Sequence, residues 1–210
     1  MNSFLQQQPL LKSQILKGRY LTYSKIETLL SDFELTQVGT SAKGLPIKAL
    51  TIGNGPVKVL MWSQMHGNEA TSTKGIMDVM YFLKGNAAFL APFTIQLIPM
   101  LNPDGAAAYT RVNANGVDLN RDAEQQSQPE IHALFEVYDA FQPDYCFNLH
   151  DQRTLFGVNG APCMLSYLSP AADADKSITE ARKQAMGIIG YMNERLQQHL
   201  SNQVGRYDDT

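Results

Sequence analysis

The stretch VKVLMWSQMHGNEA, residues 57–70, joins an apolar run to a short polar segment that holds His66 and Glu69. A nearly continuous apolar run is typical of a strand buried on both faces. A helix is predicted to follow over 70–84, with Gly85 closing it. His66 and Glu69 therefore lie after the carboxyl end of a predicted strand, which is where open α/β sheets place their sites.

Outward from this stretch, predicted strands and helices alternate along the chain. Two β-rich runs around AKG (42–44) indicate a hairpin, and Ser24 with Glu27 forms a capping-box pattern at a short helix. This alternation predicts an α/β fold with a mixed, largely parallel central sheet flanked by helices. Helices are expected at 24–32, 70–84, 129–141 and 176–200, and strands at 33–41, 45–53, 56–63, 93–101, 143–150 and 162–168.

The composition is that of a globular chain. With 210 residues, 44% hydrophobic and 18% charged, and with neither repeats nor linker-like segments, residues 1–210 are expected to form one domain. The net charge of -3 gives no electrostatic reason to expect nucleic acid or a membrane surface as partner. Since no apolar run reaches the roughly 18 residues of a membrane span, a cytoplasmic location is expected. Cys146 and Cys163 lie in apolar stretches and are predicted to be buried free thiols.

A third candidate ligand, His150, ends another predicted strand. Two imidazoles and a carboxylate suit zinc, and three protein ligands leave the fourth position that a catalytic zinc needs for water. The pattern His-x-x-Glu is weak evidence alone, because a polar turn explains His66 and Glu69 and a satisfied strand-end histidine explains His150. Further evidence comes from the polar loop at 102–122, NPDGAAAYTRVNANGVDLNRD. Its arginines suit an anionic substrate or a developing oxyanion, unless they pair with Asp118 and Asp122.

Together these segments resemble the zinc metallocarboxypeptidases related to carboxypeptidase A, in particular compact bacterial members. HGNE resembles the family's first ligand pair, NPDG and RVNANGVDLNRD its substrate-binding block, and NLHDQ the strand with its third ligand, over about residues 57–152. The resemblance implies zinc-dependent hydrolysis of a C-terminal peptide bond, with a peptide or N-acyl amino acid bearing a free carboxylate as partner. It implies His66, Glu69 and His150 as zinc ligands, Asn120 and Arg121 as carboxylate-binding residues, Arg111 as the catalytic electrophile and Asp118 as the acceptor for the other ring N–H of His66.

The chain departs from this family after His150. The family's general-base glutamate, on a late strand, has no evident counterpart, because Glu180 and Glu194 fall in an amphipathic segment typical of a solvated helix face. Tyr207 is only a positional match for the substrate-capping tyrosine. We expect a domain that lacks its C-terminal part; an inactive relative, or a base from elsewhere such as Asp151, are the alternatives.

Two other functions remain open. Zinc amidohydrolases that deacylate N-acyl amino acids, such as succinylglutamate desuccinylases and aspartoacylases, also resemble the ligand pair and the D-L-N-R pattern, although NPDG favours the peptidase. A non-catalytic zinc-dependent binding module would keep the ligands and the carboxylate clamp without a base.

Overall fold

The structure is a computed structural model that describes residues 16–152, 157–158, 160–171, 174–200 and 203–206. Its contacts divide the chain into two compact units, Met1–Asp151 and Gln152–Thr210. The candidate metal ligands and the predicted substrate-binding residues all lie in the first unit. The expectation of a single domain stays a prediction. In the described part of the chain, no helix is both long and apolar enough to cross a membrane.

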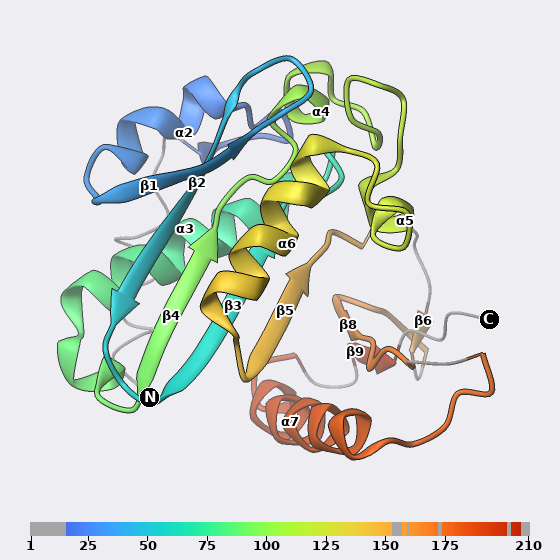
Figure 1. Ribbon diagram of the computed structural model, residues 1–210. Helices are drawn as coiled ribbons and strands as arrows, with labels where there is room; N and C mark the ends of the chain where they lie inside the picture. Colours follow the sequence, from blue (N-terminus) through green and yellow to red (C-terminus); the bar gives the residue numbers. More distant parts are fainter. Residues whose placement is uncertain (1–15, 153–156, 159, 172–173, 201–202, 207–210) are drawn as a thin grey trace. The chain divides into compact units, whose positions relative to one another are not determined.

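A five-stranded mixed sheet forms the centre of the first unit, in the order β1-β2-β4-β3-β5 (Figure 1). The strand β1 pairs antiparallel with β2, as the predicted hairpin requires, and β2 pairs antiparallel with β4. The strand β3 lies parallel to both β4 and β5. The α/β fold with a mixed sheet is thereby confirmed. The strands span Leu35–Thr40 (β1), Pro46–Gly53 (β2), Val57–Ser63 (β3), Phe93–Ile98 (β4) and Tyr145–Leu149 (β5).

Two helices cover opposite faces of this sheet (Figure 1). The helix α3, Ala70–Gly85, packs Ile76, Met77 and Met80 into one buried cluster with sheet residues. The helix α6, Pro129–Phe141, contributes to a second cluster. Because side chains of a strand alternate between faces, β2 and β4 supply residues to both clusters. The sheet is therefore held between two apolar layers, and its loops carry the polar residues.

Local details differ from the sequence prediction at two helical segments. The first described helix, α2, spans Tyr23–Leu30 with Thr22 as its N-cap, so Ser24 lies inside the helix and the predicted capping box is wrong. The oxygen Oγ1 of Thr22 contacts Oγ of Ser24 at 3.0 Å instead. The polar segment after β4 is not one long loop, because it contains the short helices α4, Pro103–Ala108, and α5, Leu119–Asp122. A short 3-10 helix, η2, spans Ala87–Leu90.

The prediction of a buried thiol is wrong for Cys146, which is exposed, and confirmed for Cys163. The strand β5 pairs with β3 on one side and ends the sheet among the described residues. Leu149 packs against the cluster on the α3 side. Strand alternation directs Cys146 to the other face, and Cys146 does not belong to the buried cluster on the α6 side. An apolar run alone did not reveal that this strand is an edge strand.

The described residues of the second unit form one long helix and four short strands. The helix α7 spans Glu180–Gln197, inside the predicted range of 176–200, and none of its residues is buried. The strands form two pairs, β6 with β7 antiparallel and β8 with β9 parallel. They span Gly157–Val158 (β6), Ala161–Pro162 (β7), Leu165–Tyr167 (β8) and Val204–Arg206 (β9).

Candidate metal centre

Three predicted ligands meet at one point of the first unit. The ring nitrogen Nδ1 of His66 lies 2.9 Å from Oε1 of Glu69, and Nδ1 of His150 lies 2.8 Å from Oε2 of the same carboxylate. One donor atom from each of the three residues lies within 4.8 Å of the others. The imidazole rings are 4.8 Å apart between centroids. Both histidines thus present the same ring nitrogen to a shared centre.

Parallel pairing of β3 and β5 explains this convergence. The last pair in the register joins Ser63 to Leu149, so the segments that follow both strands leave the sheet at the same edge. His150 comes directly after Leu149, whereas His66 lies in the connection from β3 to α3. Glu69 is the N-cap residue of α3. Strand ends that are far apart in the sequence are thereby brought to one place, as the sequence predicted.

The connection between β3 and α3 is held by buried polar groups. Gln64 is fully buried with a φ of 52°, and its amide donates to the carbonyls of Leu21 and Gly67. The side chain of Asn102, which follows β4, donates to the carbonyl of Met65 at 3.1 Å and accepts from the N–H of Gly105 at 2.8 Å. Buried polar groups that are satisfied in this way fix one backbone conformation. Gln64 and Asn102 therefore fix the path of the chain into His66.

Asp118 links the histidine to the substrate-side residues. Its Oδ1 lies 3.1 Å from Nε2 of His66 and accepts the backbone N–H of Asn120, which caps α5. Its Oδ2 accepts from Nε of Arg111 at 2.8 Å. Burial raises the pKa of Asp118, but the hydrogen bonds and charges of Arg111 and His66 outweigh burial and hold that pKa below its ordinary value. Asp118 thus lies against the second ring nitrogen of His66, as the resemblance implied, and its role as the acceptor stays a prediction.

Glu69 is almost completely buried, with 3% of its surface exposed. Burial alone would raise its pKa, yet the hydrogen bonds from His150 and His66, together with their charges, lower the pKa of Glu69 from 4.5 to about 2. Oε1 also lies 3.7 Å from Nη1 of Arg111. The carboxylate is therefore ionised at neutral pH, which is the form that binds a cation.

The predicted substrate residues Arg111, Asn120 and Arg121 each donate a hydrogen bond to Asp118. Arg111 has 48% of its side chain exposed, so part of its guanidinium faces solvent although Nε contacts Asp118. Asn120 and Arg121 are the second and third residues of the helix α5, whose N-cap residue is Asp118. Nδ2 of Asn148, on β5, donates to Oδ1 of Asn120 at 3.4 Å. Arg121 is exposed, and the alternative in which it pairs with Asp122 receives no support, since that carboxylate accepts from Ser127 and Gln128 instead.

The donor set fits zinc. Two imidazole nitrogens and one ionised carboxylate are the ligands of several catalytic zinc sites, and here they face one another without backbone rearrangement. Both nitrogens that face Glu69 are Nδ1, and Nε2 of His66 is held by Asp118. This division of roles, with one ring nitrogen available to a metal and the other bonded to a carboxylate, is usual for metal-binding histidines.

Comparison with known families agrees with this geometry. A protein-family model described as "Zinc carboxypeptidase" matches residues 22–186, which includes every candidate site residue named above. The chain belongs to the zinc carboxypeptidase family. The expected zinc cofactor follows from this membership and from the His66, Glu69 and His150 group that could hold a metal ion.

Individual relatives of this zinc carboxypeptidase family member are distant. "Carboxypeptidase SOL1" of Arabidopsis thaliana is 26% identical over an alignment of 147 residues that covers 60% of this chain and 30% of that protein. A metallo-carboxypeptidase from Burkholderia cenocepacia has 19% identity and a TM-score of 0.64, and the match covers 89% of this chain and 52% of that protein. The carboxypeptidase A of Helicoverpa armigera has 18% identity and a TM-score of 0.68, and the match covers 98% of this chain and 64% of that protein. The chain thus spans about a third to two thirds of the length of these relatives.

Two carboxylates considered for the general base lie in the second unit, on exposed positions of α7. Glu180 is exposed, and its Oε2 lies 3.9 Å from Nζ of Lys183. Glu194 is exposed as well. This confirms the solvated helix face that the sequence indicated for both. Tyr207 lies outside the described residues. Within the described part of the first unit, the carboxylate of Asp118 contacts the cluster, whereas Asp151 contacts it through its backbone N–H.

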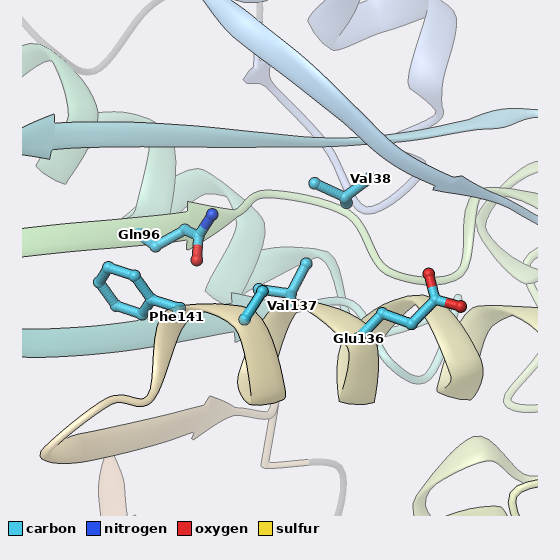
Figure 2. Close-up of a pocket in the computed structure, with 6 residues that line it drawn as sticks. Val38, Gln96, Glu136, Val137 and Phe141 are labelled. Atoms are coloured by element: carbon cyan, nitrogen blue, oxygen red, sulfur yellow. The ribbon is translucent and has the colours of Figure 1, made fainter.

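A cavity of about 350 Å³ lies elsewhere, between α6 and the sheet. Figure 2 shows Gln96 pointing from β4 towards the helix, near Val137 and Phe141. This cavity contains no histidine or cysteine and none of the predicted site residues. We therefore place the chemistry at the histidine cluster and assign no function to this cavity.

Proposed function

We propose that this chain is the metal-binding part of a zinc-dependent carboxypeptidase that hydrolyses a C-terminal peptide bond. The observation that carries the proposal is the convergence of Nδ1 of His66 and Nδ1 of His150 on the carboxylate of Glu69. These three residues would hold the ion. When bound there, zinc supplies Lewis-acid polarisation of a carbonyl and an activated water near neutral pH.

The protein's own residues would bind and orient the substrate. Arg121, exposed on α5, would pair with the terminal carboxylate, and Asn120 beside it would donate a second hydrogen bond. Arg111, about half of whose side chain is exposed, would direct its guanidinium at the scissile carbonyl and stabilise the negative charge that develops on the carbonyl oxygen. Asp118 supports this arrangement, because its two oxygens hold the guanidinium and His66 at once.

A non-catalytic zinc-dependent binding module is the second candidate. It is favoured by one specific observation: Glu180 and Glu194, the glutamates considered for the general base, are exposed on the helix α7. The chain covers only part of the length of its relatives, so a base outside the described residues is compatible with the peptidase proposal. Deacylation of N-acyl amino acids would use the same zinc, Arg111 and Arg121. It differs from the peptidase reaction in the substrate, because the amino acid then carries an acyl group in place of the rest of a peptide.

Metal content is the first test. The purified protein is expected to bind about one zinc per chain, and His66→Ala, Glu69→Ala and His150→Ala are each expected to lose it. His132→Ala is the matched control, since this histidine lies exposed on α6. Equal zinc content in all four variants and the wild type would refute the site.

Activity then separates the functions. The zinc-loaded chain is assayed against blocked dipeptides and against N-acyl amino acids, with and without a chelator. Chelator-sensitive release of the C-terminal residue from the dipeptides supports the peptidase. Turnover of N-acyl amino acids alone supports the deacylase. Tight binding of either ligand without turnover, in this chain and in a form extended at its C-terminus, supports the binding module.

A further inference from the structure

The helix α3 begins at the metal cluster without a cap of its own. Its N-cap residue, Glu69, makes no side-chain hydrogen bond to the first turn, because both carboxylate oxygens face the histidines. The first turn of α3 also contains no acidic residue. The backbone N–H groups of a first turn have no partner within the helix and need an acceptor from outside. The use of Glu69 at the cluster therefore leaves α3 in need of another cap.

Asp151, which is distant from α3 in the sequence, supplies that cap. Its Oδ2 accepts the backbone N–H of Thr71 at 2.9 Å, and its Oδ1 accepts the backbone N–H of Ser72 at 2.9 Å. The backbone N–H of Asp151 in turn donates to Oε2 of Glu69 at 3.2 Å. The exchange is reciprocal, as in a capping box, but the two acidic residues are 82 positions apart.

We propose that Asp151 is a positioning residue of the metal centre, which fixes Glu69 and His150 relative to each other. The proposal rests on the metal site proposed above. His150 precedes Asp151 directly, so the two hydrogen bonds to α3 hold the backbone of one ligand against the helix that begins at another ligand. The third bond, from the Asp151 N–H, orients the Glu69 carboxylate. A negative charge at this helix end is also favoured by the helix dipole.

This arrangement assigns Asp151 a different role from the general base that the sequence left open. Both of its oxygens are engaged by amides of α3. The geometry therefore favours a supporting role, in which Asp151 acts through Glu69 and His150.

The test compares zinc affinity and helix capping in the full chain. Zinc dissociation constants are measured by competition with a chromogenic chelator, and amide hydrogen exchange at Thr71 and Ser72 is measured on metal-free protein. Asp151→Ala is expected to exchange faster at both amides and to bind zinc about 10- to 100-fold more weakly, the range typical of lost support around ligands. Asp151→Asn keeps one acceptor oxygen and the backbone N–H, so its affinity is expected to lie between those of Asp151→Ala and the wild type.

Thr179→Ala is the matched control, because Thr179 caps α7 in the same way by accepting from the backbone N–H of Arg182. It is expected to lose a helix cap without any change in zinc affinity. If Asp151→Ala binds zinc as tightly as the wild type although Thr71 and Ser72 exchange faster, the proposal is overturned. A loss of zinc affinity in Thr179→Ala as large as that in Asp151→Ala would overturn it too. A wild-type chain that binds no zinc would refute the metal site itself, a separate result. If Asp151→Ala does not fold, Asp151→Asn decides by the same comparison.

Discussion

Gly67 and Gly105 pack backbone against backbone, so that a Cβ placed on Gly67 would lie 1.9 Å from the carbonyl carbon of Gly105. One glycine stands between the candidate ligands His66 and Glu69, and the other is the third residue of the helix α4. Neither has a positive φ, so what both positions require is close approach, not an unusual backbone conformation. The segments HGNE and NPDG are therefore parts of one contact.

Gly67→Ala is expected to destabilise the protein strongly. The added methyl group meets backbone atoms of Gly105 and Ala106, which cannot move aside as a flexible side chain would. Overpacking of this kind costs about 1–3 kcal/mol and occasionally more, and we expect the upper end of that range. At about 2–4 °C per kcal/mol for a chain of this size, the melting temperature should fall by roughly 6–12 °C in thermal unfolding followed by circular dichroism.

Gly75→Ala is the control for this substitution. Gly75 lies inside α3, is exposed, and has no atom within 4 Å of the position where a Cβ would stand. Alanine there should stabilise the helix by about 0.5–1 kcal/mol. A wild-type melting temperature for Gly67→Ala would show that the two segments do not touch in solution.

Asp118→Ala should weaken zinc binding by about 10- to 100-fold, because Nε2 of His66 would lose its acceptor. The measurement is chelator competition at constant pH. Arg111→Ala is the control, since it also removes a partner of Asp118 but leaves the His66 contact in place. If both variants bind zinc as the wild type does, Asp118 does not orient the histidine.

Arg121→Ala should reduce discrimination between a peptide and its C-terminal amide. A charge-assisted hydrogen bond to a carboxylate contributes about 1.5–3 kcal/mol, which corresponds to roughly a 10- to 100-fold preference for the free acid. Binding of a blocked dipeptide and of its amide is measured by calorimetry on zinc-loaded protein. Arg195→Ala, which alters an exposed arginine over the Tyr191 ring on α7, should leave the preference unchanged. If Arg121→Ala keeps the preference for the free acid over the amide, another cationic residue binds the terminal carboxylate of the peptide.

Much of the first unit was predictable because its signals are local and periodic. The helix at 129–141 was predicted with the bounds that α6 has, and the hairpin of β1 and β2 followed from two β-rich runs around a turn. The three candidate ligands were predictable because each follows a strand whose neighbours are parallel, so their strand ends meet. Their roles as ligands, and those of Arg111, Asn120 and Arg121, stay predictions, as does the cytoplasmic location.

The features that were missed depend on contacts between distant segments. The exposure of Cys146 follows from the place of β5 in the sheet, which an apolar run does not encode. The cap that Asp151 provides to α3 joins residues about 80 positions apart, and only the fold brings them together. The contact between Gly67 and Gly105 is similar, although a glycine in each motif was a visible signal of close approach. The capping box at Ser24 failed because Thr22 is the N-cap residue of the helix.

Asp122 gives a pH-dependent prediction outside the metal centre. Its buried carboxylate accepts the backbone N–H groups of Ser127 and Gln128 and the hydroxyl of Ser127, and so ties α5 to the start of α6. Burial would raise the pKa of Asp122, but these hydrogen bonds lower it below its ordinary value of 3.8. Because the folded pKa is depressed, the stabilisation is fully present above pH 3.8 and is lost as the pH falls through the folded value.

Asp122→Asn should therefore destabilise the protein by about 1–3 kcal/mol near neutral pH, and the difference from the wild type should shrink as the pH falls below 3.8. The free energy of unfolding is measured in urea at a series of pH values on metal-free protein, so that zinc release does not contribute. Glu136→Gln, on an exposed position of α6, removes a carboxylate that makes no such bonds and should show little difference at any pH. If the difference in unfolding free energy between Asp122→Asn and the wild type stays constant down to the acid transition, the loss comes only from poorer hydrogen-bond geometry of the amide side chain. The charge of Asp122 would then contribute nothing to holding α5 against α6.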